Sequence, residues 1–106
     1  MSTWSIEAIK NTNKNRGFFW FSQSTMRFFR SRISSKVYEG PGGVFFVSSE
    51  VPPHGKRVYA VREFDPKTGA VARSYGKDFC RSTAHRRAQQ FSQQQPYGWK
   101  EEAHNG

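Results

Sequence analysis

The chain has 106 residues and a formal net charge of +9, from 17 lysines and arginines against 8 aspartates and glutamates. This length predicts one domain. No stretch approaches the roughly 20 apolar residues that cross a bilayer, and no basic region followed by an apolar run marks a secretory signal. The single cysteine, Cys80, can form neither an internal disulfide nor a cysteine zinc site. We therefore expect a reduced, cytoplasmic protein without metal or other cofactor.

The apolar composition is unusual. Leucine is absent, and isoleucine, valine and phenylalanine make up about a fifth of the chain, near the level at which highly charged chains become disordered. Ten phenylalanines, four tyrosines and three tryptophans compensate, because each ring can bury about 150–250 Å². We expect a folded basic domain over residues 1–94 and a mobile polar tail over 95–106, which is broken by Pro96.

The first half of the chain predicts two helices. Residues 4–14 carry isoleucines at helical spacing, and this helix should end before Gly17. The aromatic run 18–21 fits either a short strand or a buried turn. Residues 25–33 place Met26, Phe29 and Ile33 on one helical face, after a capping Ser22 or Ser24.

The second half predicts three strands and a helix. The expected elements are a Gly-Pro-Gly-Gly turn at 40–43, strands at 44–47, 57–64 and 70–75, a hairpin turn at 65–69, and a helix capped by Ser82 or Thr83 that runs to about residue 94. This α-α-β-β-β-α order predicts an α+β domain, in which a three-stranded antiparallel meander is flanked by helices, with the helices on one face.

No pattern favours an enzyme. Cys80 precedes His85 by five residues, and a helix N-terminus together with Arg81 would lower a thiol pKa. The alternative is that Cys80 is a small apolar residue that closes the core beside Phe79. The three histidines share no metal-ligand spacing. The glycine-rich turn at 40–43 lacks the following helix of a phosphate loop, and no nucleophile or nucleotide fingerprint is present.

Basic residues are the stronger signal. Residues 1–50 carry a net charge of +4, residues 51–95 carry +6 and the last eleven carry −1, so the charge belongs to the folded part. Arg81, Arg86 and Arg87 fall at the start of the last predicted helix, where cations oppose the helix dipole. The arrangement makes sense if an anion docks there. The alternative is a solvated basic face without a ligand.

Residues 48–61, with Pro52-Pro53-His54-Gly55-Lys56-Arg57 in the middle, resemble the first hairpin of a double-stranded RNA-binding domain. Residues 22–93 are also similar to that family in size and predicted element order. The resemblance implies duplex RNA binding through the loop and the start of the last helix. The helix itself departs from the family's Lys-Lys-x-Ala-Lys pattern, because it reads Ser82-Thr83-Ala84-His85-Arg86-Arg87-Ala88.

A second resemblance covers residues 18–92. Thr-Met-Arg-Phe-Phe-Arg-Ser-Arg at 25–32 and Phe-Asp-Pro-Lys-Thr-Gly at 64–69 are similar to a family of small uncharacterised phage and plasmid proteins. The resemblance implies an origin in a mobile element and no particular mechanism.

The leading hypothesis is a non-enzymatic accessory protein that binds duplex RNA, DNA or a nucleoprotein through phosphates. The predicted contact residues are His54, Lys56, Arg57, Arg81, Arg86, Arg87, Arg27 and Arg30. The competing hypothesis is a small inhibitor of a host defence system, similar to anti-CRISPR proteins, that binds a host protein complex. Exposed rings among Trp20, Phe21, Phe28 and Tyr38 would then serve as interface anchors, although core packing is the alternative for most of them. Neither hypothesis involves a membrane or a small-molecule substrate.

Overall fold

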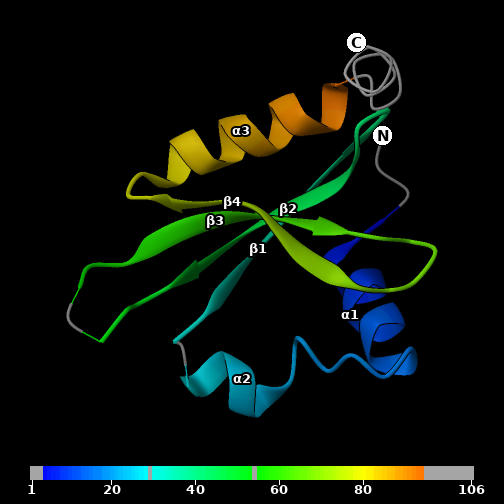
Figure 1. Ribbon diagram of the computed structural model, residues 1–106, viewed down its shortest axis with the longest axis horizontal. Helices are drawn as coiled ribbons and strands as arrows, with labels where there is room; N and C mark the ends of the chain where they lie inside the picture. The colour runs from blue at the N-terminus through cyan, green and yellow to red at the C-terminus, as the bar shows by residue number, and fades with distance from the viewer. Residues whose placement is uncertain (1–3, 29, 54, 95–106) are drawn as a thin grey trace, which may run out of the picture.

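Four strands form one antiparallel sheet in chain order, with three helices around it (Figure 1). The computed structural model describes residues 4–28, 30–53 and 55–94. Within these ranges the elements are α1 (Ile6–Asn15), α2 (Gln23–Phe28), β1 (Arg32–Gly40), β2 (Gly43–Glu50), β3 (Val58–Phe64), β4 (Val71–Asp78) and α3 (Arg81–Gln93). The expected tail at 95–106 lies outside the described residues. None of the described helices has the length and apolar character needed to cross a bilayer.

The sheet is covered on both faces. Phe46 of β2 and Phe64 of β3 face α1, where they pack in one buried cluster with Ile9. Phe45 and Val47 alternate with Phe46 along β2, so they face the other side and pack in a second cluster against Ala84 and Ala88 of α3. Figure 1 shows α3 and α1 on opposite sides of the strands. The α+β class is confirmed, but the prediction of helices on one face is wrong, because β2 is apolar on both of its faces.

The three predicted strands are present as β2, β3 and β4 of an antiparallel meander. The sheet has a fourth strand, however, and the prediction of a helix over 25–33 is wrong. The second helix ends early, since Arg30 adopts a left-handed φ of 51°. The amide of Arg30 donates to the carbonyl of Arg27, and the amide of Ser31 donates to that of Met26, which is the Schellman pattern that closes a helix. An arginine occupies the position that glycine usually holds. The chain then enters β1, a fourth strand on the edge of the sheet.

Two predicted boundaries are confirmed. Gly17 has a φ of 85° and lies directly beyond α1. The Asp65 turn joins β3 to β4, with its carboxylate accepting from the Lys67 amide and the Thr68 hydroxyl. These bonds lower the pKa of Asp65, the Lys67 amide most. The last helix differs from its prediction at the start, since α3 begins at Arg81, with Cys80 in the capping position.

The glycine-rich turn at 40–43 connects β1 to β2 and lies against the C-terminal end of α3. The amide of Gly42 donates to the carbonyl of Ser92 at 2.9 Å. A Cβ on Gly42 would overlap the carbonyl oxygen of Phe91, and one on Gly40 would overlap that of Ser92. These two glycines therefore permit close approach of two backbones, which fixes α3 over the sheet.

Candidate functional site

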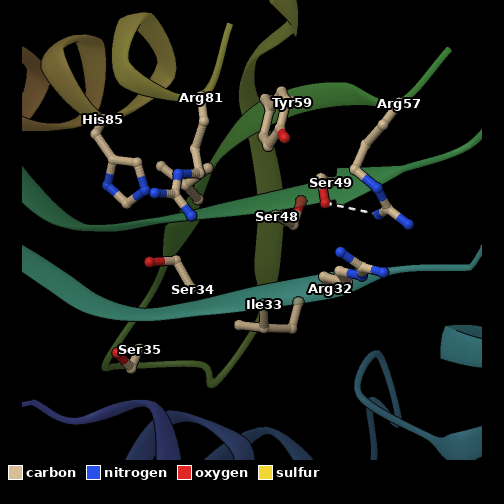
Figure 2. Close-up of a pocket in the computed structure, with 11 residues that line it drawn as sticks. Arg32, Ile33, Ser34, Ser35, Ser48, Ser49, Arg57, Tyr59, Arg81 and His85 are labelled. Atoms are coloured by element: carbon tan, nitrogen blue, oxygen red, sulfur yellow. Dashed lines mark hydrogen bonds between the residues drawn. The ribbon is translucent and has the colours of Figure 1, made fainter. Parts of the chain in front are cut away.

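A pocket of about 330 Å³ opens on the α3 side of the sheet, between β1 and the first turns of α3 (Figure 2). Four elements or their adjoining loops contribute to its wall. The lining residues are Arg32, Ile33, Ser34, Ser35, Val47, Ser48, Ser49, Arg57, Tyr59, Arg81 and His85. Three are arginines and four are serines, and no acidic side chain is among the described residues of the wall.

Strand register brings part of this wall together. Arg32 of β1 pairs with Ser49 of β2, and Ser49 pairs with Tyr59 of β3. Residues paired across antiparallel strands share a face of the sheet, so these three form a row on the side of α3. The register of β1 shifts between Ile33 and Val37, an irregularity that lies next to this row and includes Ser34 and Ser35.

Arg57 is held in place before any ligand arrives. Its Nη1 donates to the Ser49 hydroxyl at 2.8 Å and to the Arg30 carbonyl at 3.0 Å. In Figure 2 the guanidinium groups of Arg32 and Arg57 turn toward each other above the β1–β2 pair. Neither arginine forms an ion pair within the described ranges. Two like charges that converge in this way are stabilised by an anion placed between them.

His85 forms the opposite wall with Arg81. Its Nδ1 lies 2.8 Å from the hydroxyl of Tyr38 on β1. Burial lowers the pKa of His85 below 6.5, and the nearby charges of Arg81 and Lys36 lower it further. Burial also raises the pKa of Tyr38. At neutral pH the imidazole is therefore neutral, and its hydrogen bond with the phenol links β1 to α3 across the site.

The structure divides the predicted contact residues. Arg57 and Arg81 line the pocket, and Arg86 lines an adjoining hollow. Arg87 lies apart from them: its Nε is 3.1 Å from the Asp78 carboxylate and its guanidinium covers the ring of Tyr75 at 4.0 Å. The expectation of one arginine cluster at the helix start is therefore wrong. Neighbouring residues of a helix project about 100° apart, so Arg86 lines the adjoining hollow while Arg87 turns toward β4.

The remaining predicted contacts surround the pocket or fall elsewhere. Lys56, Arg27 and Arg30 are exposed outside the wall. Arg30 contributes through its backbone carbonyl, which accepts from Arg57. His54 lies outside the described residues.

Cys80 neither closes the core nor pairs with His85. The thiol is exposed, and the neighbouring Phe79 ring is 73% exposed. The sulfur lies 3.0 Å from the Ser82 hydroxyl. This hydroxyl and the first backbone amides of α3 lower the pKa of Cys80 to about 7. Among the described residues, no three histidine, cysteine or acidic side chains gather in a group that could hold a metal ion.

The aromatic residues considered as interface anchors are mostly core. Trp20 and Phe21 pack against the cluster under α1, and Tyr38 packs against the cluster under α3. The side chain of Phe28 lies outside the described part of the structure. Phe18 and Phe19 are instead exposed, at 50% and 58%.

Sequence reasoning missed Arg32, Tyr59 and the serines of the pocket. Arg32 was part of a predicted helix, so its place beside Ser49 could not be inferred. The available signal was Ile33 between the polar residues Arg32 and Ser34, because alternation of polar and apolar residues is typical of a strand with one exposed face. The resemblance to a double-stranded RNA-binding domain implies that the hairpin at 48–61 joins the first two strands. In the structure it joins the second and third strands, β2 and β3.

Comparison with known proteins gives one result. No curated protein and no solved structure is significantly similar to the chain. A family model described as a family of unknown function (DUF7447) matches residues 5–93, which include all seven helices and strands described above and the whole pocket. The chain belongs to this family of unknown function, DUF7447.

Proposed function

We propose that the protein is a non-enzymatic cytoplasmic module that binds nucleic acid through phosphate contacts in the pocket between β1 and α3. The observation that carries the proposal is the convergence of Arg32, Arg57 and Arg81 on one cavity without an acidic residue among its described wall. Guanidinium groups bind phosphate oxygens with two parallel hydrogen bonds. The hydroxyls of Ser34 and Ser49 supply further polar groups in the same cavity.

The two ion pairs of the described residues support this assignment. Arg62 pairs with Glu50 in the interior and Arg87 pairs with Asp78 beside β4. Both carboxylates are thus engaged away from the pocket, and the pocket arginines keep their full positive field. Besides burial, this field lowers the pKa of His85, and Arg81 is one of the charges responsible. An anion in the pocket would relieve the repulsion.

Charge beyond the pocket favours a polyanion over a small phosphate ester. The chain carries +9 overall, and exposed cations continue on either side of the cavity at Lys56, Arg30 and Arg86. A polymer with regularly spaced phosphates can engage these cations together and release its condensed counterions, which strengthens binding at low salt.

The test is a fluorescence anisotropy titration of labelled single-stranded and duplex DNA and RNA with the full chain. We expect saturable binding at low salt that weakens steeply between about 50 and 200 mM salt. An absence of binding to all four nucleic acids at low salt would overturn the proposal. Competition with inorganic phosphate is the control. Millimolar phosphate should displace a ligand that is held by one pocket, but it should displace poorly a polymer that is held by several cations together.

Exposure of Phe18 and Phe19 favours a second candidate, an inhibitor from a phage or plasmid that binds a host protein complex. Both residues follow α1, which lies on the side of the sheet opposite α3, and Phe19 has a left-handed φ of 54°. Large exposed rings are common anchors of protein interfaces. Recovery of one complex from host lysate that resists nuclease, and that Phe18→Ala abolishes, would support this candidate over nucleic-acid binding.

A further inference from the structure

The pocket continues into a second hollow along α3. This hollow, of about 600 Å³, is lined by Ser34, Tyr38, Arg81, Ser82, His85, Arg86 and Gln89. Ser34, Arg81 and His85 line both cavities, so the two adjoin. Together they form a trough between β1 and α3, which we call the β1–α3 trough. Arg32 and Arg57 line only the pocket, and Arg86 lines only the second hollow.

Both parts of the trough combine cations with an aromatic ring. The pocket has Tyr59 beside its three arginines, and the second hollow has Tyr38 beside Arg81 and Arg86. The imidazole of His85 lies at the junction, oriented by its hydrogen bond to Tyr38. Arg81 and Arg86 are five residues apart, which is about 7.5 Å along the helix axis. Cations with aromatic rings beside them are the composition of grooves that follow a single strand.

A duplex would not use these rings. Its bases are stacked inside, so a protein that reads only its phosphates gains nothing from aromatic side chains recessed between a helix and a strand. A single strand can place its phosphates on arginines while its exposed bases stack on tyrosine or histidine. We infer that the β1–α3 trough binds single-stranded nucleic acid, with phosphates on Arg32, Arg57 and Arg81 and with bases against Tyr59 and His85. This inference rests on the proposed function and names its ligand.

The experiment compares three ligands of equal length on the wild-type chain: a mixed-sequence single strand, its duplex, and a strand with abasic sugars in place of nucleosides. Anisotropy competition at fixed salt measures each affinity, with DNA and RNA versions in parallel arms. Stacking of one base on one ring contributes about 1–3 kcal/mol, so the abasic strand should bind at least about fivefold more weakly than the normal strand. The duplex should also bind more weakly than the single strand.

Two variants connect the preference to the trough. Tyr59→Leu should reduce affinity for the single strand by about fivefold or more and leave affinity for the abasic strand unchanged, whereas Tyr59→Phe should keep both. Equal binding of the normal and abasic strands, or duplex binding as tight as single-strand binding, would overturn the inference while the proposed function stands. Absence of binding to every ligand would overturn both. The wild-type comparison decides the matter even if Tyr59→Leu fails to fold.

Discussion

Replacing Gly42 with alanine tests how the β1–β2 turn fixes α3 above the pocket. The new Cβ would overlap the carbonyl oxygen of Phe91 and come within 3.0 Å of the Gln94 carbonyl oxygen, closer than ordinary van der Waals contact, so backbone has to move. Such overpacking costs about 1–3 kcal/mol. The movement also weakens the hydrogen bond from the Gly42 amide to Ser92, which contributes about 0.5–1.5 kcal/mol.

Alanine partly offsets this cost, because it restricts the unfolded chain and stabilises by about 0.4–1 kcal/mol. The net expectation for Gly42→Ala is a loss of about 2–3 kcal/mol of unfolding free energy, which lowers Tm by about 10–20 °C in a domain of this size. Urea and thermal unfolding followed by circular dichroism measure both quantities.

Gly17→Ala is the matched control. A Cβ on Gly17 meets nothing within 4 Å, and this position costs only its left-handed φ of 85°, about 1 kcal/mol. The steric reasoning would be refuted if Gly42→Ala unfolded within about 0.5 kcal/mol of the wild type, the usual range for substitutions that disturb nothing.

Three further predictions concern single residues. Because the pKa of Cys80 is lowered to about 7, alkylation by iodoacetamide should level off near pH 8, and a rate that still rises steeply from pH 8 to 9 would contradict the cause assigned to Ser82 and the helix amides. Burial lowers the pKa of His85 below the 6.5 of an unfolded chain, so its contribution to stability is complete above pH 6.5 and is lost as pH falls through the folded pKa. His85→Gln should flatten the pH dependence of the unfolding free energy over that interval, and an unchanged pH dependence would contradict this reasoning. Phe19 has a left-handed φ of 54° and a mostly exposed ring. The unfolding free energy of Phe19→Gly should therefore exceed that of Phe19→Ala by about 1 kcal/mol, the reverse of the usual order of glycine and alanine.

Local chemistry made some elements predictable. Gly17 ends α1 and the Asp65 turn joins two strands, since both use residues whose side chain, or lack of one, selects the turn directly. The edge strand β1 was not predictable in this way. Arg30 ends α2 in a conformation that only hydrogen bonds and tertiary contacts impose, and Met26 with Ile33 imitates helical spacing across that break.

The pocket follows the same division. Arg57 and Arg81 were inferred as contacts from charge, because each stands next to a predicted turn or helix start. Arg32 and Tyr59 join them through the register of β1, β2 and β3, and register depends on pairing between distant residues, which composition does not encode. The pairing of Arg87 with Asp78, nine residues earlier, likewise depends on how the chain turns from β4 into α3.

The most direct test of the phosphate pocket is the salt dependence of single-strand binding by Arg81→Ala. Arg81 lines both parts of the β1–α3 trough and is exposed, so the variant should fold. Loss of one phosphate contact should reduce the log–log salt slope by about 0.7. Lys14→Ala removes the same charge from exposed α1, on the opposite face of the sheet, and should leave affinity and slope unchanged. A folded Arg81→Ala with the wild-type slope, or an equal reduction in Lys14→Ala, would contradict the assignment of phosphate binding to this pocket.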